Sequence, residues 1–188
     1  EKAVQKIVYG KCTNAGQTCI APDYVLLHES LKSDFIKQFE KEVQDFYSDN
    51  PESSNSYSRI VNSKHFERLS NSLEDAKQKG SVIESGGRTN ASDCYMEPTL
   101  ISGLTEDTTL MQDEIFGPIL PLKTYKTIEE AVAYVNQNEK PLALYIFSKK
   151  NKVIDYVIEN TRAGSTCVNH NLLQFLNHNL PFGGSNNS

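Results

Sequence analysis

The sequence predicts an α/β protein with an open, mostly parallel sheet that helices cover on both faces. Two observations predict it. From residue 120 onward, strand-like and helix-like segments alternate along the chain. One of the strand-like segments, residues 142–147, is almost fully apolar and does not alternate between apolar and polar residues. Strands of this kind are typical of parallel sheets that are buried between two helical layers.

Apolar residues at helical spacing predict three helices in the first part of the chain. These helices cover residues 1–13, 31–47 and about 63–79. We expect Ser30 to cap the second helix, and Gly80 to end the third.

Three extended segments accompany these helices, at residues 24–28, 81–84 and 96–101. The first is a short apolar run after a proline, which predicts a buried strand. In the third, Pro98 favours a sheet edge or a bend because proline cannot donate a backbone hydrogen bond.

The second part of the chain predicts strands at residues 120–125, 142–147 and 165–169. Between the first two strands, Thr127 and Glu130 form a capping box, in which Thr127 caps a helix and Glu130 reaches back. Between the last two, we expect Asn151 to cap a second helix. The apolar residues of that helix are expected to point inward; they are Val153, Ile154, Val157 and Ile158.

Composition limits the classes of function. The 188 residues are enough for one domain, and the net charge of −5 comes with no cluster of basic residues. This argues against nucleic acid and against an anionic membrane surface as partners. No apolar run reaches the roughly 20 residues that span a bilayer, and the first residues do not form a signal peptide.

The four cysteines lie far apart, at positions 12, 19, 94 and 167. This spacing favours neither a disulfide framework nor a zinc site, so we expect no metal and a reducing, cytoplasmic location.

Cys19 is the first candidate for chemistry. It ends the run Gly16-Gln17-Thr18-Cys19, in which small and polar residues surround the thiol. Gly16 lets the backbone bend, and Ala21 before Pro22 forces an extended exit. These residues alone fit either a half-buried structural cysteine or a nucleophile on a loop. The sequence holds four histidines but offers no spacing that pairs one of them with this thiol.

A second candidate is the segment 113–118, where two acids precede Ile115, Phe116 and a Gly-Pro turn. It reads equally well as a solvated loop or as an acid and an aromatic ring on a rigid turn. A carboxylate can accept two hydrogen bonds from sugar hydroxyls, and a ring offers a flat face to a planar ligand. The two Gly-Gly pairs fit no nucleotide-binding fingerprint.

Four segments occur in the order found in the aldehyde dehydrogenase superfamily. Residues 14–19 resemble the active-site cysteine motif of that family, and residues 114–118 resemble its second signature. Residues 141–145 and 180–184 follow in the matching order. Three further segments look most like the class 3 or fatty-aldehyde branch: 19–24, 57–60 and 139–142. The resemblance covers essentially the whole chain.

This resemblance implies oxidation of aldehydes to carboxylic acids with NAD or NADP. It makes Cys19 the nucleophile, which forms a thiohemiacetal and, after hydride transfer to the nicotinamide, a thioester that water hydrolyses. It implies that Glu114 holds the nicotinamide ribose hydroxyls and that Phe116 packs beside the nicotinamide. Four apolar residues fall where the family lines its substrate entrance, and their character suits an aliphatic or aromatic aldehyde: Leu172, Phe175, Leu176 and Phe182.

In the family, the general base, the second oxyanion donor and the coenzyme-binding fold all precede the cysteine motif, and this chain contains none of them. We therefore expect residues 1–188 to be a catalytic domain without its coenzyme-binding domain. The fragment alone should not turn over, and it should self-associate, although the full-length enzyme is expected to be a homodimer. Two alternatives remain: a non-catalytic remnant or binding module, and a thiol esterase or acyl-transfer activity that uses Cys19.

Overall fold

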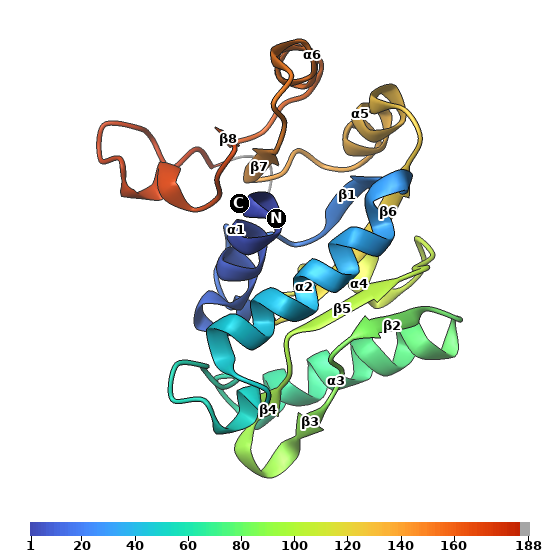
Figure 1. Cartoon of the computed structure of the whole chain (residues 1–188), viewed down its shortest axis with the longest axis vertical. Coiled ribbons are helices and arrows are strands. Elements are labelled where there is room, and N and C mark those ends of the chain that lie inside the picture. The colour runs from blue at the N-terminus through green and yellow to red at the C-terminus, as the bar shows by residue number, and fades with distance from the viewer. Residues whose placement is uncertain (185–188) are drawn as a thin grey trace. The chain divides into compact units, whose positions relative to one another are not determined.

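The computed structural model describes residues 1–184, which fall into two compact units divided between Thr124 and Tyr125 (Figure 1). The helices of the first unit are α1 Lys2–Cys12, α2 Lys32–Tyr47, α3 Ser63–Gln78 and α4 Thr109–Gln112. Its strands are β1 Val25–His28, β2 Val82–Ser85, β3 Thr89–Asn90, β4 Tyr95–Met96, β5 Thr99–Ser102 and β6 Ile119–Tyr125. The second unit contains α5 Ile128–Gln137, β7 Ala143–Ile146, α6 Asn151–Asn160 and β8 Ser165–Val168. Within residues 1–184, no helix combines the length and the apolar character that crossing a membrane requires.

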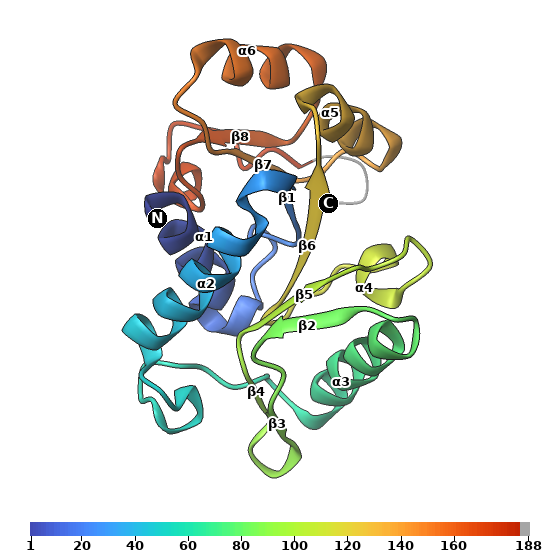
Figure 2. The ribbon, with the colours of Figure 1, turned by 45° about the vertical axis from the view of Figure 1, so that its right-hand side comes forward.

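The first unit is built on a four-stranded sheet in the order β1-β6-β5-β2. Strands β5 and β6 are parallel, with Thr99 opposite Ile119, whereas β2 and β5 are antiparallel, with Val82 opposite Ser102. Figure 2 shows α1 and α2 on one side of this sheet and α3 on the other. The α/β class with helices on both faces is therefore confirmed, and the parallel pairing extends to β7 and β8 in the second unit.

The core of the first unit lies between the sheet and these helices, because each helix turns one apolar face inward. Its fully buried apolar side chains include Val8, Phe39, Leu69, Leu100, Ile101, Ile119 and Leu120. Strand β1 differs from the prediction of a buried strand, because all four of its residues are only half-buried.

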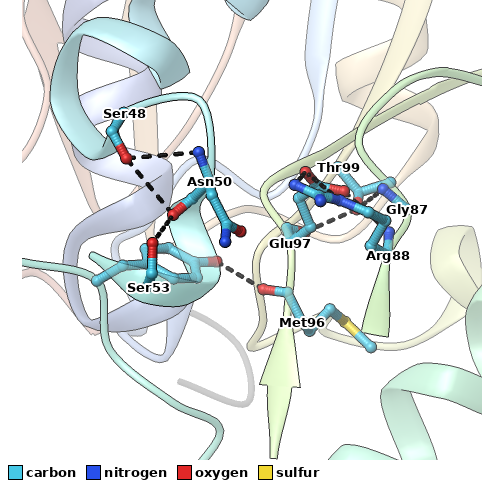
Figure 3. A network of polar contacts seen from close by, with 9 residues as sticks. Ser48, Asn50, Ser53, Gly87, Arg88, Met96, Glu97 and Thr99 are labelled. Carbon is cyan, nitrogen blue, oxygen red and sulfur yellow. Dashed lines mark hydrogen bonds and ion pairs between the residues drawn. The ribbon is translucent and has the colours of Figure 1, made fainter. Parts of the chain in front are cut away.

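Pro98 lies between β4 and β5, and a polar network joins Glu97 and Thr99 to Gly87 and Arg88 (Figure 3). Glu97 accepts hydrogen bonds from Nε and Nη2 of Arg88, at 3.0 and 2.7 Å. The Thr99 hydroxyl donates to the Glu97 carbonyl at 2.7 Å and accepts the Gly87 N–H at 3.0 Å. The predicted extended segment is thus two strands, and β4 pairs with β3 in a hairpin that the sequence did not predict.

In the second unit, α6 connects the parallel strands β7 and β8, as a parallel pair requires. The loop that follows β8 returns to the start of that strand at Gly183. A Cβ atom on Gly164 would overlap the Gly183 carbonyl, and a Cβ on Gly183 would overlap the Gly164 carbonyl. The Gly-Gly motif at 183–184 therefore allows a close approach of two backbones.

Two predicted helix caps are wrong. Ser30 lies inside a short 3-10 helix, Glu29–Leu31. The Nδ1 atom of His28 accepts the Ser30 N–H at 3.3 Å and lies 2.8 Å from the Ser30 hydroxyl oxygen, with which it shares a hydrogen bond. Leu31 is therefore the residue before α2. Asn151 is the first residue inside α6, and Lys150 precedes it. No α6 residue is fully buried, so its apolar side is only partly covered.

Candidate active site

The loop that carries Cys19 begins where α1 ends, with a run of left-handed backbone. Asn14, Ala15 and Gly16 have φ values of 52°, 51° and 74°. Asparagine and glycine tolerate this region, but alanine does so only at a cost of about 1 to 2 kcal/mol. Ala15 is nevertheless almost completely buried, while Cys19 is exposed. The chain therefore adopts strained backbone just before the thiol, as functional sites often do.

Gly16 lies directly against the second candidate segment. A Cβ atom on Gly16 would overlap the carbonyl group of Gly117, so no larger residue fits there. A Cβ on Gly117 would lie 2.6 Å from both methyl groups of Leu69 on α3, so the Leu69 side chain would have to shift to admit it. The structure thus packs the cysteine loop and the segment around Glu114 together, backbone against backbone.

The Gln17 side chain links the same loop by hydrogen bonds to residues 59 and 61. Its amide nitrogen donates to the carbonyl of Arg59 at 3.0 Å, and its amide oxygen accepts the N–H of Val61 at 2.9 Å. The nitrogen also donates to the Asn14 carbonyl at 2.9 Å, and the Asn14 side chain donates to the Gln17 carbonyl at 3.1 Å. Sequence reasoning noted Gln17 only as a neighbour of the cysteine, because its partners Arg59 and Val61 lie more than 40 residues away.

The turn at 114–116 alternates between solvent and core. Glu114 and Phe116 are exposed, whereas Ile115 between them is 1% exposed. Phe116 has a φ of 46°, which is unusual for a bulky residue. The turn is therefore anchored by Ile115 and presents an acid and a ring outward.

Charged side chains surround this anchor. Ile115 donates its N–H to Asp23 Oδ1 at 3.2 Å, and its carbonyl accepts from Arg68 Nη2 at 2.7 Å. Arg68 Nη1 also lies 3.5 Å from the Glu114 carbonyl, and Lys11, at the end of α1, is buried beside the cluster. Sequence reasoning missed these three charged residues. Asp23 follows Cys19 closely enough to be considered, but no sequence signal brings Arg68 to the turn.

Burial dominates the ionisation of this cluster. It lowers the pKa of the Lys11 ammonium, against the opposing charge of Asp23. It raises the pKa of Asp23, although Lys11, the Ile115 N–H and Arg68 all oppose that shift. Loss of solvent raises the pKa of Glu114 first, and the charge of Asp23 raises it further. Both carboxyl groups therefore hold their protons more tightly than free side chains do.

The thiols of Cys12 and Cys19 differ in their exposure to solvent. Cys12 is buried, and burial raises the pKa of its thiol to about 12. Such a group stays protonated and unreactive near neutral pH. Cys19 is exposed, and its side chain makes no hydrogen bond within residues 1–184, to a histidine or to any other group. Cys19 is thus the accessible thiol of this loop.

The four predicted pocket residues all lie in the second unit, and they are described within it. Leu172, with a φ of 62°, precedes the short 3-10 helix Leu173–Leu176. The rings of Phe175 and Phe182 meet edge to face, with centroids 5.8 Å apart. The two rings are about half-exposed, so this loop carries apolar surface to solvent.

Comparison with known proteins shows which family this chain is similar to. The sequence profile of the aldehyde dehydrogenase family matches residues 1–188. The 4,4'-diaponeurosporen-aldehyde dehydrogenase of Staphylococcus aureus is 45% identical over 182 residues, which are 97% of this chain and 39% of that protein. Aldehyde dehydrogenase family 3 member A2 of Mus musculus is 42% identical over 182 residues, which are 97% of this chain and 37% of that protein.

Among solved structures, the substrate-bound state of Staphylococcus aureus AldH superposes with a TM-score of 0.93 at 44% identity. The match covers 97% of this chain and 39% of that one. The chain therefore spans about two fifths of the length of these relatives.

Proposed function

Because the chain belongs to the aldehyde dehydrogenase family, we propose that it supplies the nucleophile and one side of the coenzyme site of an enzyme that oxidises aldehydes to carboxylic acids. Its likeness to a family 3 relative supports the class 3 or fatty-aldehyde branch. One observation carries the proposal. Cys19 is an exposed thiol on a strained loop, and that loop packs through Gly16 against the turn that presents Glu114 and Phe116.

Cys19 carries the covalent chemistry. Its thiolate forms a C–S bond to the aldehyde carbon while the carbonyl π electrons move to oxygen, which the Cys19 N–H helps to stabilise. When the alkoxide re-forms its C=O bond, the carbon loses its hydrogen as hydride and a thioester remains on Cys19. Water then adds to the thioester and the C–S bond breaks. One proton of the water passes to the departing sulfur, so the carboxylic acid is released and the Cys19 thiol is regenerated.

Glu114 and Phe116 are the residues of this chain that would hold NAD or NADP, which supplies the hydride acceptor when it is bound. The Glu114 side chain is exposed, and its carboxylate accepts no hydrogen bond within residues 1–184. It therefore has acceptor capacity for two ribose hydroxyls. The exposed Phe116 ring offers a flat apolar face to the nicotinamide end.

The same proposal covers the larger subunit, its oligomeric state, its location and its substrate. Residues 1–188 form the catalytic portion of a larger subunit, which is a homodimer in the cytoplasm. The limited share of each relative that the chain spans supports the first point. The free thiols of Cys12, Cys19 and Cys94 support a reducing compartment. The apolar residues around Phe175 and Phe182 suit an aliphatic or aromatic aldehyde as the substrate.

The test is a cysteine replacement in the protein that carries this chain. Cys19→Ser should lower NAD(P)H formation from an aldehyde by more than about a thousandfold, as loss of a covalent nucleophile does. Cys94→Ser is the matched control, because Cys94 lies in a separate turn of the same unit, and it should retain turnover. Undiminished oxidation by Cys19→Ser would disprove the proposal.

A second candidate function is thiol-ester chemistry without hydride transfer. It is favoured because the cysteine loop and the turn behind it lie within one compact unit, Glu1–Thr124. A small activated ester should then acylate Cys19 of the 188-residue chain, while the same chain forms no NAD(P)H with an aldehyde. Mass spectrometry would locate the acyl group, and its absence from Cys19 in the folded chain would reject this candidate.

Alkylation separates the two thiols directly. Iodoacetamide at about pH 8 should modify Cys19 more than about 100-fold faster than Cys12, since the Cys12 thiolate is scarce. In denaturant the two rates should converge. Equal rates in the folded chain would contradict both the burial of Cys12 and the accessibility of Cys19.

A further inference from the structure

Two charged side chains hold both backbone groups of one residue in the candidate coenzyme turn. Asp23 Oδ1 accepts the Ile115 N–H at 3.2 Å. Arg68 Nη2 donates to the Ile115 carbonyl at 2.7 Å. The two side chains come from different parts of the unit, since Asp23 lies four residues after Cys19 and Arg68 lies on α3. The backbone of Ile115 is therefore held from both of its polar ends.

The turn needs such support because its backbone is unusual. Phe116 has a left-handed φ of 46°, which persists in a bulky residue only where the surroundings determine it. The buried Ile115 side chain seats the turn in the core, but burial of a side chain alone does not fix the backbone on either side. The hydrogen bonds from Asp23 and Arg68 act directly on the peptide groups that flank Ile115, one of which leads into Phe116.

The supporting charges are themselves held in place. Lys11 is 1% exposed, and its ammonium favours the ionised form of Asp23. Arg68 adds a second contact, from Nη1 to the Glu114 carbonyl at 3.5 Å. Its neighbour Leu69 packs under Gly117, so α3 supports the turn through both residues. Hydrogen bonds to charged groups are stronger and more directional than neutral ones, which suits them to fix a geometry.

We propose that Asp23 and Arg68 are positioning residues for coenzyme binding. They hold the turn in the conformation that presents the Glu114 carboxylate and the Phe116 ring outward. This inference rests on the proposed function, because coenzyme binding by the turn is itself part of that proposal.

The first test does not depend on activity. Amide hydrogen exchange in the 188-residue chain should show a protected Ile115 N–H. Asp23→Ala should raise its exchange rate by about tenfold or more, as loss of a bond to a charged acceptor predicts. Asp75→Ala is the matched control, because Asp75 also accepts a backbone N–H, that of Thr109 at 2.9 Å. The control should expose the Thr109 amide and leave the Ile115 amide protected.

The second test measures coenzyme binding in the protein that carries this chain. Asp23→Ala and Arg68→Met should each raise the dissociation constant of NAD(P) by about tenfold, and the coenzyme KM with it. The aldehyde KM and the alkylation rate of Cys19 should stay within about twofold of the parent, because neither depends on ribose contacts. Arg88→Met is the control for arginine loss, since Arg88 bonds Glu97 away from the turn.

Conservative variants separate positioning from simple loss of fold. Asp23→Asn keeps an oxygen for the Ile115 N–H and should restore most of the coenzyme affinity. Arg68→Lys replaces a two-pronged donor with one ammonium and should fall between the parent and Arg68→Met. If Asp23→Ala or Arg68→Met does not fold, an intermediate affinity in a folded Arg68→Lys protein still supports the proposal.

The outcomes are distinguishable. Parent-like coenzyme affinity in Arg68→Lys and in folded Asp23→Ala would overturn the positioning role. An unchanged Ile115 exchange rate in Asp23→Ala would overturn the contact on which that role depends. A parent protein that binds no NAD(P) would instead defeat the proposed function, while the exchange experiment would still report on the contact.

Discussion

At the residue scale, the candidate site depends on where side chains are missing. Gly16 and Gly117 let the cysteine loop and the turn touch through their backbones, which no pair of larger residues would allow. Around them, Ala15 and Phe116 accept left-handed backbone at a cost in stability. The site therefore combines close contact with strain, and both are set by single residues.

Gly16→Ala should destabilise the chain strongly. The new methyl group would overlap the Gly117 carbonyl, and the φ of 74° adds strain, so we expect a loss of more than about 3 kcal/mol in the free energy of unfolding. Gly80→Ala is the control, because Gly80 has a φ of 87° but nothing within 4 Å of a new Cβ. It should cost only about 1 kcal/mol. Urea denaturation of both variants measures the difference, and equal losses would show that strain alone matters.

Glu114 should weaken the fold at neutral pH. Its pKa is raised by loss of solvent and by Asp23, so the folded chain binds this proton more tightly than the unfolded chain does. The folded state is therefore stabilised as the pH falls through the raised pKa, and this contribution is lost as the pH rises.

Glu114→Gln should thus be more stable than the parent at pH 7. The gap should shrink as the pH falls through the raised pKa of Glu114, and it should stop changing below the ordinary value of 4.5. Urea titrations at the two pH values check this expectation. A gap that grows on acidification would mean that Arg68 and Lys11 outweigh the other influences.

At the element scale, the start of α5 shows how closely a capping box predicted from the sequence matches the hydrogen bonds in the structure. The Thr127 hydroxyl accepts the Glu130 N–H at 3.4 Å, as the predicted capping box requires. The Glu130 carboxylate reaches one residue further back than expected and accepts the Lys126 N–H at 2.8 Å. The start of α5 is thus held by a long bond from the cap and a short, charge-assisted bond from the acid.

The two bonds should differ in strength. Thr127→Val should lower the free energy of unfolding by about 0.5 kcal/mol, and Glu130→Ala by about 1 to 1.5 kcal/mol. Glu129→Ala, in the same first turn, should cost less than Glu130→Ala, because the Glu129 carboxylate makes no hydrogen bond to the part of the chain that the structure describes. Chemical denaturation can rank the three variants. A larger loss of unfolding free energy in Thr127→Val than in Glu130→Ala would show that the bond from the cap is the stronger of the two.

Helix α3 shows how one element can serve both core and site. Its buried face includes Phe66, Leu69 and Leu73, which pack in the core of the first unit. From the edge of that face, Arg68 reaches the Ile115 carbonyl, and the methyl groups of Leu69 pack closely against Gly117. The periodicity of α3 predicts the buried face, but not the contacts of the residue beside it.

At the scale of the whole molecule, the exposed apolar side chains gather in the second unit. Phe175 and Leu176 are 58% and 65% exposed, and three more lie close in sequence: Leu173, Leu180 and Phe182. Apolar groups gathered in this way mark contact surfaces. We therefore expect the 188-residue chain to self-associate.

Sedimentation or light scattering tests this expectation. Replacing Phe175 and Leu176 together by serine should weaken the association, because it removes the largest exposed apolar groups of the loop. Leu31→Ser is the control, since Leu31 is 50% exposed but lies in the first unit. A parent chain that stays monomeric at high concentration would contradict the expectation.

The elements were largely predictable because hydrophobic periodicity is a local property. The three long helices of the first unit and the strands around residues 120, 145 and 166 all appear near their predicted bounds. The errors lie where side chains compete locally, as at Ser30 and Asn151, or where short elements carry little periodicity, as in β3 and α4. The antiparallel pairing of β2 with β5 also had no local signal.

The sequence by itself determined the α/β class, the family, the cysteine motif and the acid-and-ring pair that follows. These depend on residue types and on their spacing along the chain. Only the tertiary structure decided that Gly16 touches Gly117, that Gln17 is bonded to residues 59 and 61, and that Asp23 and Arg68 hold Ile115. Those contacts join residues that lie 42 to 101 positions apart. Such contacts form only when the helices and the sheet have packed together, and spacing along the chain does not encode them.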